Sequence, residues 1–223
     1  CKMNKWLQQF KEILLHEFGE SIQFIGLQGS HARNEATENS DIDVVVIFDT
    51  LSIDKLKRYE VVVQTMSDRH LLCGFVGGMD DLNSWDKADL FTFIYDTKTV
   101  YGQLAISKTA ITTAHVKKYV RSTAGNIYHM TLHNYLHGKS TEMIHGLFKN
   151  ARFAIQGNVF LQQTEFISQL NELSTVTKGY DTDVITRLIS LKNNAQVDLD
   201  KDTELLLAWS KEILQAVKDE TLS

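Results

Sequence analysis

Proline is absent from this chain of 223 residues, and cysteine is nearly absent, since only Cys1 and Cys73 occur. Two cysteines cannot form the disulfide framework of a small secreted domain, and neither has the spacing of a metal site. A reducing, cytoplasmic location is therefore expected. No apolar stretch is long enough to cross a membrane, and no charged-then-apolar signal segment opens the sequence. We expect no membrane partner.

An excess of basic residues is also lacking. Residues 1–112 contain 11 Lys and Arg against 16 Asp and Glu, and residues 113–223 contain 12 of each kind. A nucleic-acid polymerase would need a basic stripe to neutralise phosphates, so no nucleic-acid partner is expected. An acidic N-terminal half suits metal ions and a cationic acceptor. Hydrophobic and charged fractions of 43% and 23% are ordinary for a globular protein.

Two acidic residues open the most apolar strand-like segment of the chain. Asp41-Ile42-Asp43 leads into a short β-branched run over 44–48 that reads as a buried strand. Side chains at i and i+2 lie on one face of a strand, so the two carboxylates point the same way while Ile42 points into the core. Adjacent carboxylates repel each other, and magnesium, which binds carboxylates together with substrate phosphates, removes that penalty. If no ion binds there, the two acids are solvated residues at a strand end.

A small-residue turn precedes this pair. Residues 21–28 read as a strand that ends at Gly29-Ser30, eleven positions before Asp41. Gly29 allows the backbone to approach a phosphate, and Ser30 offers a hydroxyl and an N–H group. A short helix over 31–34 would present its first amides to the same anion. Arg33 can reach a triphosphate or pair with a nearby glutamate, and Ser40 is expected to orient the start of the strand.

The segments Gly29-Ser30-x-Ala32-Arg33 and Ser40-Asp41-Ile42-Asp43 resemble the signature of the DNA polymerase β-like nucleotidyltransferase superfamily. Within it, the closest likeness is to small bacterial antibiotic-type (aminoglycoside/kanamycin-like) nucleotidyltransferases. The resemblance implies a two-ion magnesium site, ATP as donor, a small-molecule acceptor and pairing into homodimers. It differs at Asn34, where the family often has glycine. Asn tolerates a left-handed backbone, so we expect the turn to persist.

The resemblance also implies a third carboxylate on a neighbouring strand. Residues 89–96 read as that strand, with Asp89, Phe91 and Phe93 on one face. Asp89 is the first choice for the remaining metal ligand or general base, and Asp80, Asp81 and Asp86 compete with it. A cap or turn role for Asp89 is the structural alternative.

Periodicity predicts an α+β fold in which a mixed sheet flanked by helices precedes an all-helical domain. The boundaries are 1–108 for the catalytic domain and 109–223 for a helical bundle that completes the substrate and nucleotide cleft. The predicted N-terminal elements are helices over 5–17 and 54–67 and strands over 21–28, 41–48 and 71–76, with Gly77-Gly78 breaking the last. The predicted C-terminal helices are 113–138, one opened by Ser140 and interrupted at Gly157-Asn158, 164–173, 183–192 and 201–218.

Three histidines, His129, His133 and His137, recur at helical spacing on one face. Two histidines one turn apart can bind zinc, but no Glu or Cys completes a recognised pattern. Metal binding, contact with the substrate or base, and an ordinary surface stripe remain alternative interpretations.

These features predict a magnesium-dependent nucleotidyltransferase. Asp41, Asp43 and Asp89 would bind metal and act in catalysis, and Gly29, Ser30, Arg33 and Ser40 would contact the nucleotide. The expected reaction transfers AMP from ATP to a hydroxyl of an antibiotic-like acceptor and releases pyrophosphate. The alternatives are a protein-AMPylating transferase of toxin–antitoxin type and a non-catalytic nucleotide-binding module.

Overall fold

The computed structural model describes residues 2–216 and divides the chain into two compact units, 1–110 and 111–223. The first unit contains a four-stranded sheet with the strand order β3-β2-β1-β4. Strand β1 is antiparallel to β2 and to β4, whereas β2 and β3 are parallel. This mixed sheet with flanking helices confirms the predicted α+β class. The strands are β1 (Ile22–Leu27), β2 (Ile42–Phe48), β3 (Leu72–Gly78) and β4 (Lys98–Gly102).

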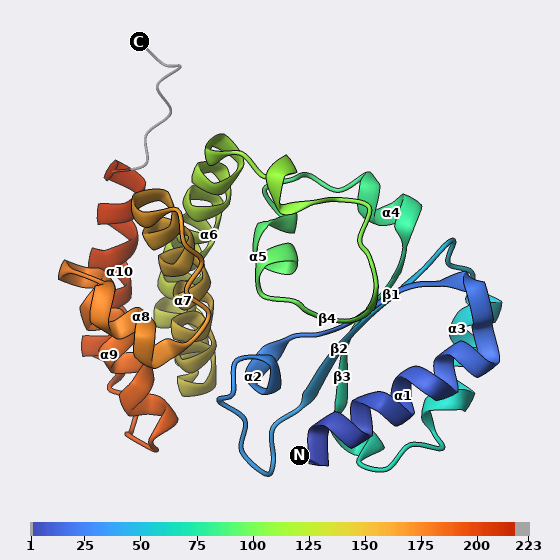
Figure 1. Ribbon diagram of the computed structural model, residues 1–223. Helices are drawn as coiled ribbons and strands as arrows, with labels where there is room; N and C mark the ends of the chain where they lie inside the picture. Colours follow the sequence, from blue (N-terminus) through green and yellow to red (C-terminus); the bar gives the residue numbers. More distant parts are fainter. Residues whose placement is uncertain (1, 217–223) are drawn as a thin grey trace. The chain divides into compact units, whose positions relative to one another are not determined.

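Helices lie on both sides of this sheet (Figure 1). On one side, α1 and α3 pack together, and on the other α4 and α5 follow β3 in the chain. The helices are α1 (Lys2–Phe18), α2 (Gly29–Ala32), α3 (Ile53–Val63), α4 (Met79–Asn83) and α5 (Leu90–Tyr95), with short 3-10 turns η1 (Gly19–Ser21), η2 (Arg69–Leu71) and η3 (Lys108–Ala110). Ser52 caps α3, because its side chain accepts a hydrogen bond from the backbone N–H of Lys55.

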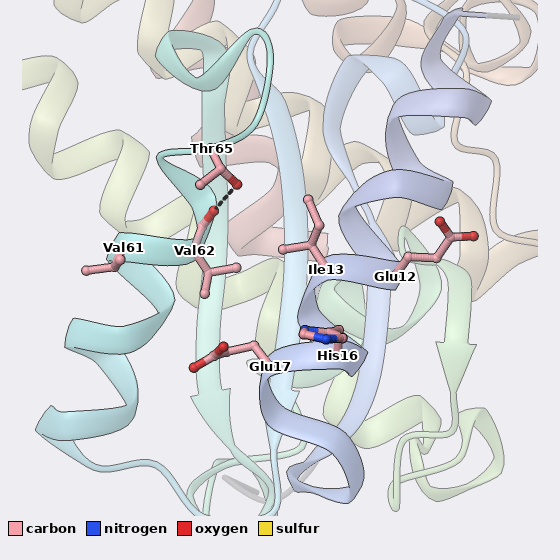
Figure 2. Close-up of a pocket in the computed structure, with 7 residues that line it drawn as sticks. All are labelled: Glu12, Ile13, His16, Glu17, Val61, Val62 and Thr65. Carbon is pink, nitrogen blue, oxygen red and sulfur yellow. Dashed lines mark hydrogen bonds between the residues drawn. The ribbon is translucent and has the colours of Figure 1, made fainter.

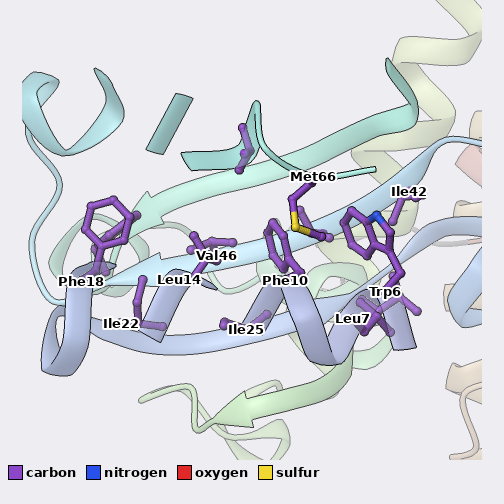
Figure 3. Close-up of a cluster of buried hydrophobic side chains, with 14 of the residues drawn as sticks. Trp6, Leu7, Phe10, Leu14, Phe18, Ile22, Ile25, Ile42, Val46 and Met66 are labelled. Carbon is purple, nitrogen blue, oxygen red and sulfur yellow. The ribbon is translucent and has the colours of Figure 1, made fainter. Parts of the chain in front are cut away.

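One apolar core joins α1 to the sheet (Figure 3). Trp6 and Phe10 stack with ring centroids 5.1 Å apart, and the indole of Trp6 donates a 2.7 Å hydrogen bond to the carbonyl of Ser67. The buried sheet side chains in this core come from one face only: Ile22, Ile25 and Leu27 of β1 and Ile42, Val44, Val46 and Phe48 of β2. The alternate residues, Asp43 among them, therefore belong to the opposite face.

The predicted strand over 89–96 is wrong. Residues 90–95 form α5, whose buried side chains Leu90, Phe91 and Ile94 follow helical spacing. A short apolar run is compatible with both the strand period of two residues and the helical period of 3.6 residues. The aromatic residues of this segment favoured a strand in the prediction. The segment starts in a turn where Asp86 accepts a hydrogen bond from the N–H of Ala88. The predicted break at Gly77-Gly78 is also wrong, since both glycines belong to β3.

In residues 111–216, the second unit, all regular elements are helical. They are α6 (Thr113–His133), the π-turn η4 (Asn134–Gly138), α7 (Thr141–Gln163), α8 (Leu170–Val176), α9 (Gly179–Lys192) and α10 (Leu199–Ala216). Gly157-Asn158 does not interrupt α7, because Asn158 donates a 2.8 Å hydrogen bond to Asp181 of α9 and the helices pack closely there. The helix predicted over 164–173 begins at Leu170, later than predicted. No helix within residues 2–216 combines the length and apolarity that a bilayer span requires.

Candidate active site

The Gly29-Ser30 turn lies directly against Asp43. Gly29 begins α2 with φ +68, and a Cβ atom added there would lie 1.8 Å from Oδ2 of Asp43. The backbone N–H of Gln28 donates a 2.7 Å hydrogen bond to the carbonyl of Asp43, which ties the end of β1 to the start of β2. Only glycine suits both the left-handed backbone and this close approach. The turn and the carboxylate therefore form one structural unit.

The two predicted metal ligands differ in their surroundings. Asp41 is exposed just before β2, Ile42 is buried in the core and Asp43 is half-buried on the face away from that core. Burial raises the pKa of the Asp43 carboxyl above its ordinary value, and the charge of Asp41 raises it further. The charges of Arg33 and His31 and a hydrogen bond from the Cys73 thiol act in the opposite direction. A half-buried carboxylate that feels a second like charge is suited to a divalent cation.

Magnesium fits this donor set. In the described part of the chain, no three His, Cys, Asp or Glu side chains form a group that could hold a metal ion. Magnesium sites are seldom built entirely from protein groups, because the ion keeps waters and takes phosphate oxygens of the substrate beside one or two carboxylates. Asp41 and Asp43 would supply those carboxylates. An ion at this site would therefore be completed by a nucleotide.

Asp89 does not join this pair in the structure. It is exposed at the residue that precedes α5, and within residues 2–216 no three-carboxylate cluster includes it. Cys73 is the residue opposite Asp43 in the parallel pairing of β2 with β3. The neighbouring strand thus presents a thiol where the family resemblance led us to expect a third carboxylate. Asp43 and Cys73 are each the second residue of their strand. A parallel alignment of the two strands from their first residues would therefore have predicted that Cys73 lies beside Asp43.

Arg33 is held by acids rather than extended towards a phosphate. Its Nη1 atom lies 2.5 Å from Asp96, and Nε lies 3.6 Å from Glu35. The side chains of Arg33 and Asp96 are only 12% and 8% exposed. Pairing with a nearby glutamate was one of the predicted alternatives, whereas the contact with Asp96 was not predicted. The ion pair joins α2 to the end of α5 and so positions the turn.

The loop from α2 to β2 has the expected turn chemistry. Asn34 adopts a left-handed backbone with φ 58, as predicted for the residue that replaces glycine. The Ser40 hydroxyl accepts a 2.8 Å hydrogen bond from the N–H of Thr37, so it shapes the backbone just before Asp41. A hollow of about 720 Å³ lies beside this loop, and its lining includes His31, Glu38 and His70.

Another hollow, of about 500 Å³, lies between α1 and α3 (Figure 2). Its lining is largely apolar and includes Ile13, Val61 and Val62, with Glu12 and Glu17 at the side. These helices cover the face of the sheet opposite to Asp43. The hollow is therefore separate from the candidate active site.

The three histidines lie in the second unit. Their rings follow one another along one face, with centroid separations of 6.3 Å from His129 to His133 and 5.0 Å from His133 to His137. All three residues are exposed. The expected shared face is confirmed, and its role stays open.

Comparison with known proteins gives a family match to part of the chain. Residues 7–71 match the nucleotidyltransferase domain family, and that segment includes Gly29, Ser30, Asp41 and Asp43. No curated protein gives a significant match to the sequence.

Among solved structures, spectinomycin adenyltransferase AAD(9) from Enterococcus faecialis, crystallised with ATP and spectinomycin, is similar with a TM-score of 0.57 at 13% identity. That match covers 95% of this chain and 99% of the other. A toxin–antitoxin structure with AMP-PNP matches with a TM-score of 0.35 at 19% identity, over 53% of this chain and 90% of that one. At such identities the likeness concerns the fold. The chain therefore contains a match to the nucleotidyltransferase domain over residues 7–71, and it shares the fold of AAD(9).

Proposed function

We propose that this protein transfers AMP from ATP to a hydroxyl group of a small-molecule acceptor in a magnesium-dependent reaction. The observation that carries the proposal is the contact of Gly29 with Asp43, with Asp41 two residues earlier in the chain, just before β2. A glycine turn for a polyphosphate thus lies against a carboxylate pair for divalent ions. The ATP-bound state of AAD(9) supports ATP as the donor.

In this proposal each residue has a defined task. Gly29 and Ser30 hold the β- and γ-phosphates, and Asp41 and Asp43 hold the ions. Arg33, fixed by Asp96, keeps the turn against β2. When bound, magnesium supplies positive charge that stabilises the attacking and leaving oxygens of an in-line displacement. The bond from the acceptor oxygen to the α-phosphorus forms, the bond from that phosphorus to the bridging oxygen of pyrophosphate breaks, and the acceptor hydroxyl releases its proton to water.

Transfer from ATP labelled at the α- or γ-phosphorus tests this reaction. We expect the α-label to move to an acceptor in a panel of aminoglycosides, spectinomycin and lincosamides, and the γ-label to leave as pyrophosphate. Asp41→Asn and Asp43→Asn should abolish transfer. Asp49→Asn is the matched control, because Asp49 follows the far end of β2 and pairs with Lys55 at 2.5 Å. Movement of the γ-label to the acceptor would contradict nucleotidyl transfer.

The same assay with cell extract separates the alternatives. Labelled protein bands without labelled small molecules would favour a protein-AMPylating enzyme. Binding of ATP with no transfer to any acceptor would favour a non-catalytic nucleotide-binding module.

A further inference from the structure

The histidine stripe of the second unit has no task in the proposed nucleotidyl transfer. His129, His133 and His137 share one face and are exposed, so their imidazole rings are accessible to ions in solution. Histidine is the side chain most often found as a metal ligand in proteins. Within residues 2–216, no three His, Cys, Asp or Glu side chains form a group that could hold a metal ion. A metal site in this stripe can therefore use only two of the three rings.

The ring separations select which two. A zinc ion about 2.1 Å from a ring nitrogen lies about 3.2 Å from the centroid of that ring. Two rings that bind one ion at the tetrahedral angle of about 109° therefore have centroids about 5.2 Å apart. The centroids of His133 and His137 are 5.0 Å apart, close to this value. Those of His129 and His133 are 6.3 Å apart, which would require an angle of about 160° at a shared ion.

The backbone that carries the closer pair is fixed by its own turn. His133 ends α6 and His137 lies in η4, where the N–H of Lys139 donates a 2.7 Å hydrogen bond to the carbonyl of Asn134. The buried Asn134 amide donates to the carbonyl of Ser140 and accepts from its N–H, both at 3.0 Å. Short π-helical turns occur frequently at functional sites. Ligands on a rigid backbone are held close to the geometry that an ion requires.

The lysine next to this pair is engaged with an aromatic ring. Nζ of Lys139 lies 3.6 Å from the ring centroid of Tyr135, and the hydroxyl of Tyr135 donates a 3.0 Å hydrogen bond to Asp200 of α10. Residues 129–139 contain no Asp or Glu and no other Lys or Arg. The imidazole nitrogens are therefore the metal-binding side-chain groups that this segment offers.

A pair of nitrogen ligands without carboxylates selects a class of ion. Imidazole suits zinc, copper and nickel, whereas magnesium takes oxygen ligands. We propose that His133 and His137 bind one divalent transition-metal ion, such as Zn²⁺ or Cu²⁺, through one ring nitrogen each, and that water completes its coordination. The general order of affinities among first-row ions predicts that copper binds more tightly than zinc or nickel. This site lies within the second unit and differs in chemistry from the carboxylate pair of the first.

Calorimetric titration of the full-length protein tests the site. Cu²⁺, Zn²⁺ and Ni²⁺ are titrated, with magnesium in excess, into protein in which Cys1→Ser and Cys73→Ser remove the competing thiols. One ion should bind per chain in the stripe, and copper should bind most tightly. His133→Ala and His137→Ala should each weaken binding about 100-fold, the order of the gain from linking two binding groups in one molecule. His129→Ala is the matched control and should leave the affinity unchanged.

A chemical footprint locates the ion in the wild type. Diethylpyrocarbonate modifies accessible imidazole nitrogens, and mass spectrometry measures the extent of modification at each histidine. Zinc should protect His133 and His137. His129, and the exposed His16 of α1, should react as fast as they do without metal.

Three results would overturn the proposal. Equal affinity in the wild type and in His137→Ala would place any bound ion elsewhere in the protein. A loss in His129→Ala as large as the loss in His137→Ala would show that the stripe has no preferred pair. Protection by zinc spread evenly over the exposed histidines would show adventitious binding to the surface.

The histidine site and the proposed function can fail separately. Asp43→Asn should bind zinc as the wild type does, although it should lose magnesium-dependent nucleotide binding. If Asp43→Asn lost zinc binding while His133→Ala kept it, the zinc would lie at the carboxylate pair and the histidine site would be wrong. If the wild type bound zinc at the histidines but no nucleotide, nucleotidyl transfer would be wrong and the histidine site would stand.

Discussion

Replacement of Gly29 by alanine is the most discriminating perturbation of the site. The added Cβ would lie 1.8 Å from Oδ2 of Asp43, and real Cβ contacts are essentially never shorter than 3.0 Å. The carboxylate, the turn or both must therefore move by roughly 1 Å or more. A misplacement of about 1 Å in a reacting constellation can cost about 100-fold in rate. We expect kcat/KM to fall by about that factor and magnesium-dependent nucleotide binding to weaken.

The backbone contributes a separate effect. Gly29 has φ +68, and a left-handed conformation costs a residue with a side chain about 1–2 kcal/mol. Gly19→Ala isolates this term, because Gly19 has φ +53 and an added Cβ there would meet nothing within 4 Å. Both variants should therefore lose stability of this order in urea unfolding, and only Gly29→Ala should lose activity.

The assay compares pyrophosphate release with the unfolding midpoint for the two variants. If Gly29→Ala kept wild-type activity while it lost as much stability as Gly19→Ala, the contact with Asp43 would have no catalytic meaning. An equal loss of activity in both variants would show that backbone strain, rather than the position of the carboxylate, controls the reaction.

Three further predictions concern charge. Asp43→Asn should raise the Tm of the magnesium-free protein at neutral pH, because the folded-state pKa of Asp43 is raised and its ionisation therefore opposes folding. The gain in Tm should vanish at low pH, where the wild-type carboxyl is protonated. For the same reason, the affinity for magnesium in the presence of nucleotide, measured by calorimetry, should fall as the pH decreases through that raised pKa. An affinity that does not change between neutral pH and pH 4 would refute the assignment. Arg33→Ala should lower the free energy of unfolding in urea by about 3 kcal/mol or more, since it leaves the buried Asp96 without this partner. Arg58→Ala, which breaks an exposed ion pair with Glu17, should lower it by less than about 1 kcal/mol.

The turn and the carboxylate pair were predictable because their signals are local. Alternation along a strand places Asp41 and Asp43 on one side of Ile42, and the structure buries Ile42 at 2% exposure. The left-handed backbone of Asn34 follows from a property of asparagine itself. The helical spacing of Trp6, Phe10 and Leu14 in α1 likewise places them on one face, and all three are buried.

The remaining features depend on contacts between distant segments. The sequence shows that 89–96 is apolar, but only packing decides between a strand and the helix α5. The pairing of Asp43 with Cys73 requires knowledge that β2 and β3 are parallel and in register. Likewise, the sequence offers several acidic residues as partners for Arg33, and only the fold brings Asp96, 63 residues away, within contact of it.

Calorimetric titration of α,β-methylene-ATP into the wild type and Asp43→Asn, each with and without magnesium, tests the central claim most directly. The account predicts that magnesium strengthens nucleotide binding to the wild type by a large factor and changes binding to Asp43→Asn little. Equal magnesium dependence in the two proteins would contradict the assignment of the strand carboxylates as the metal site.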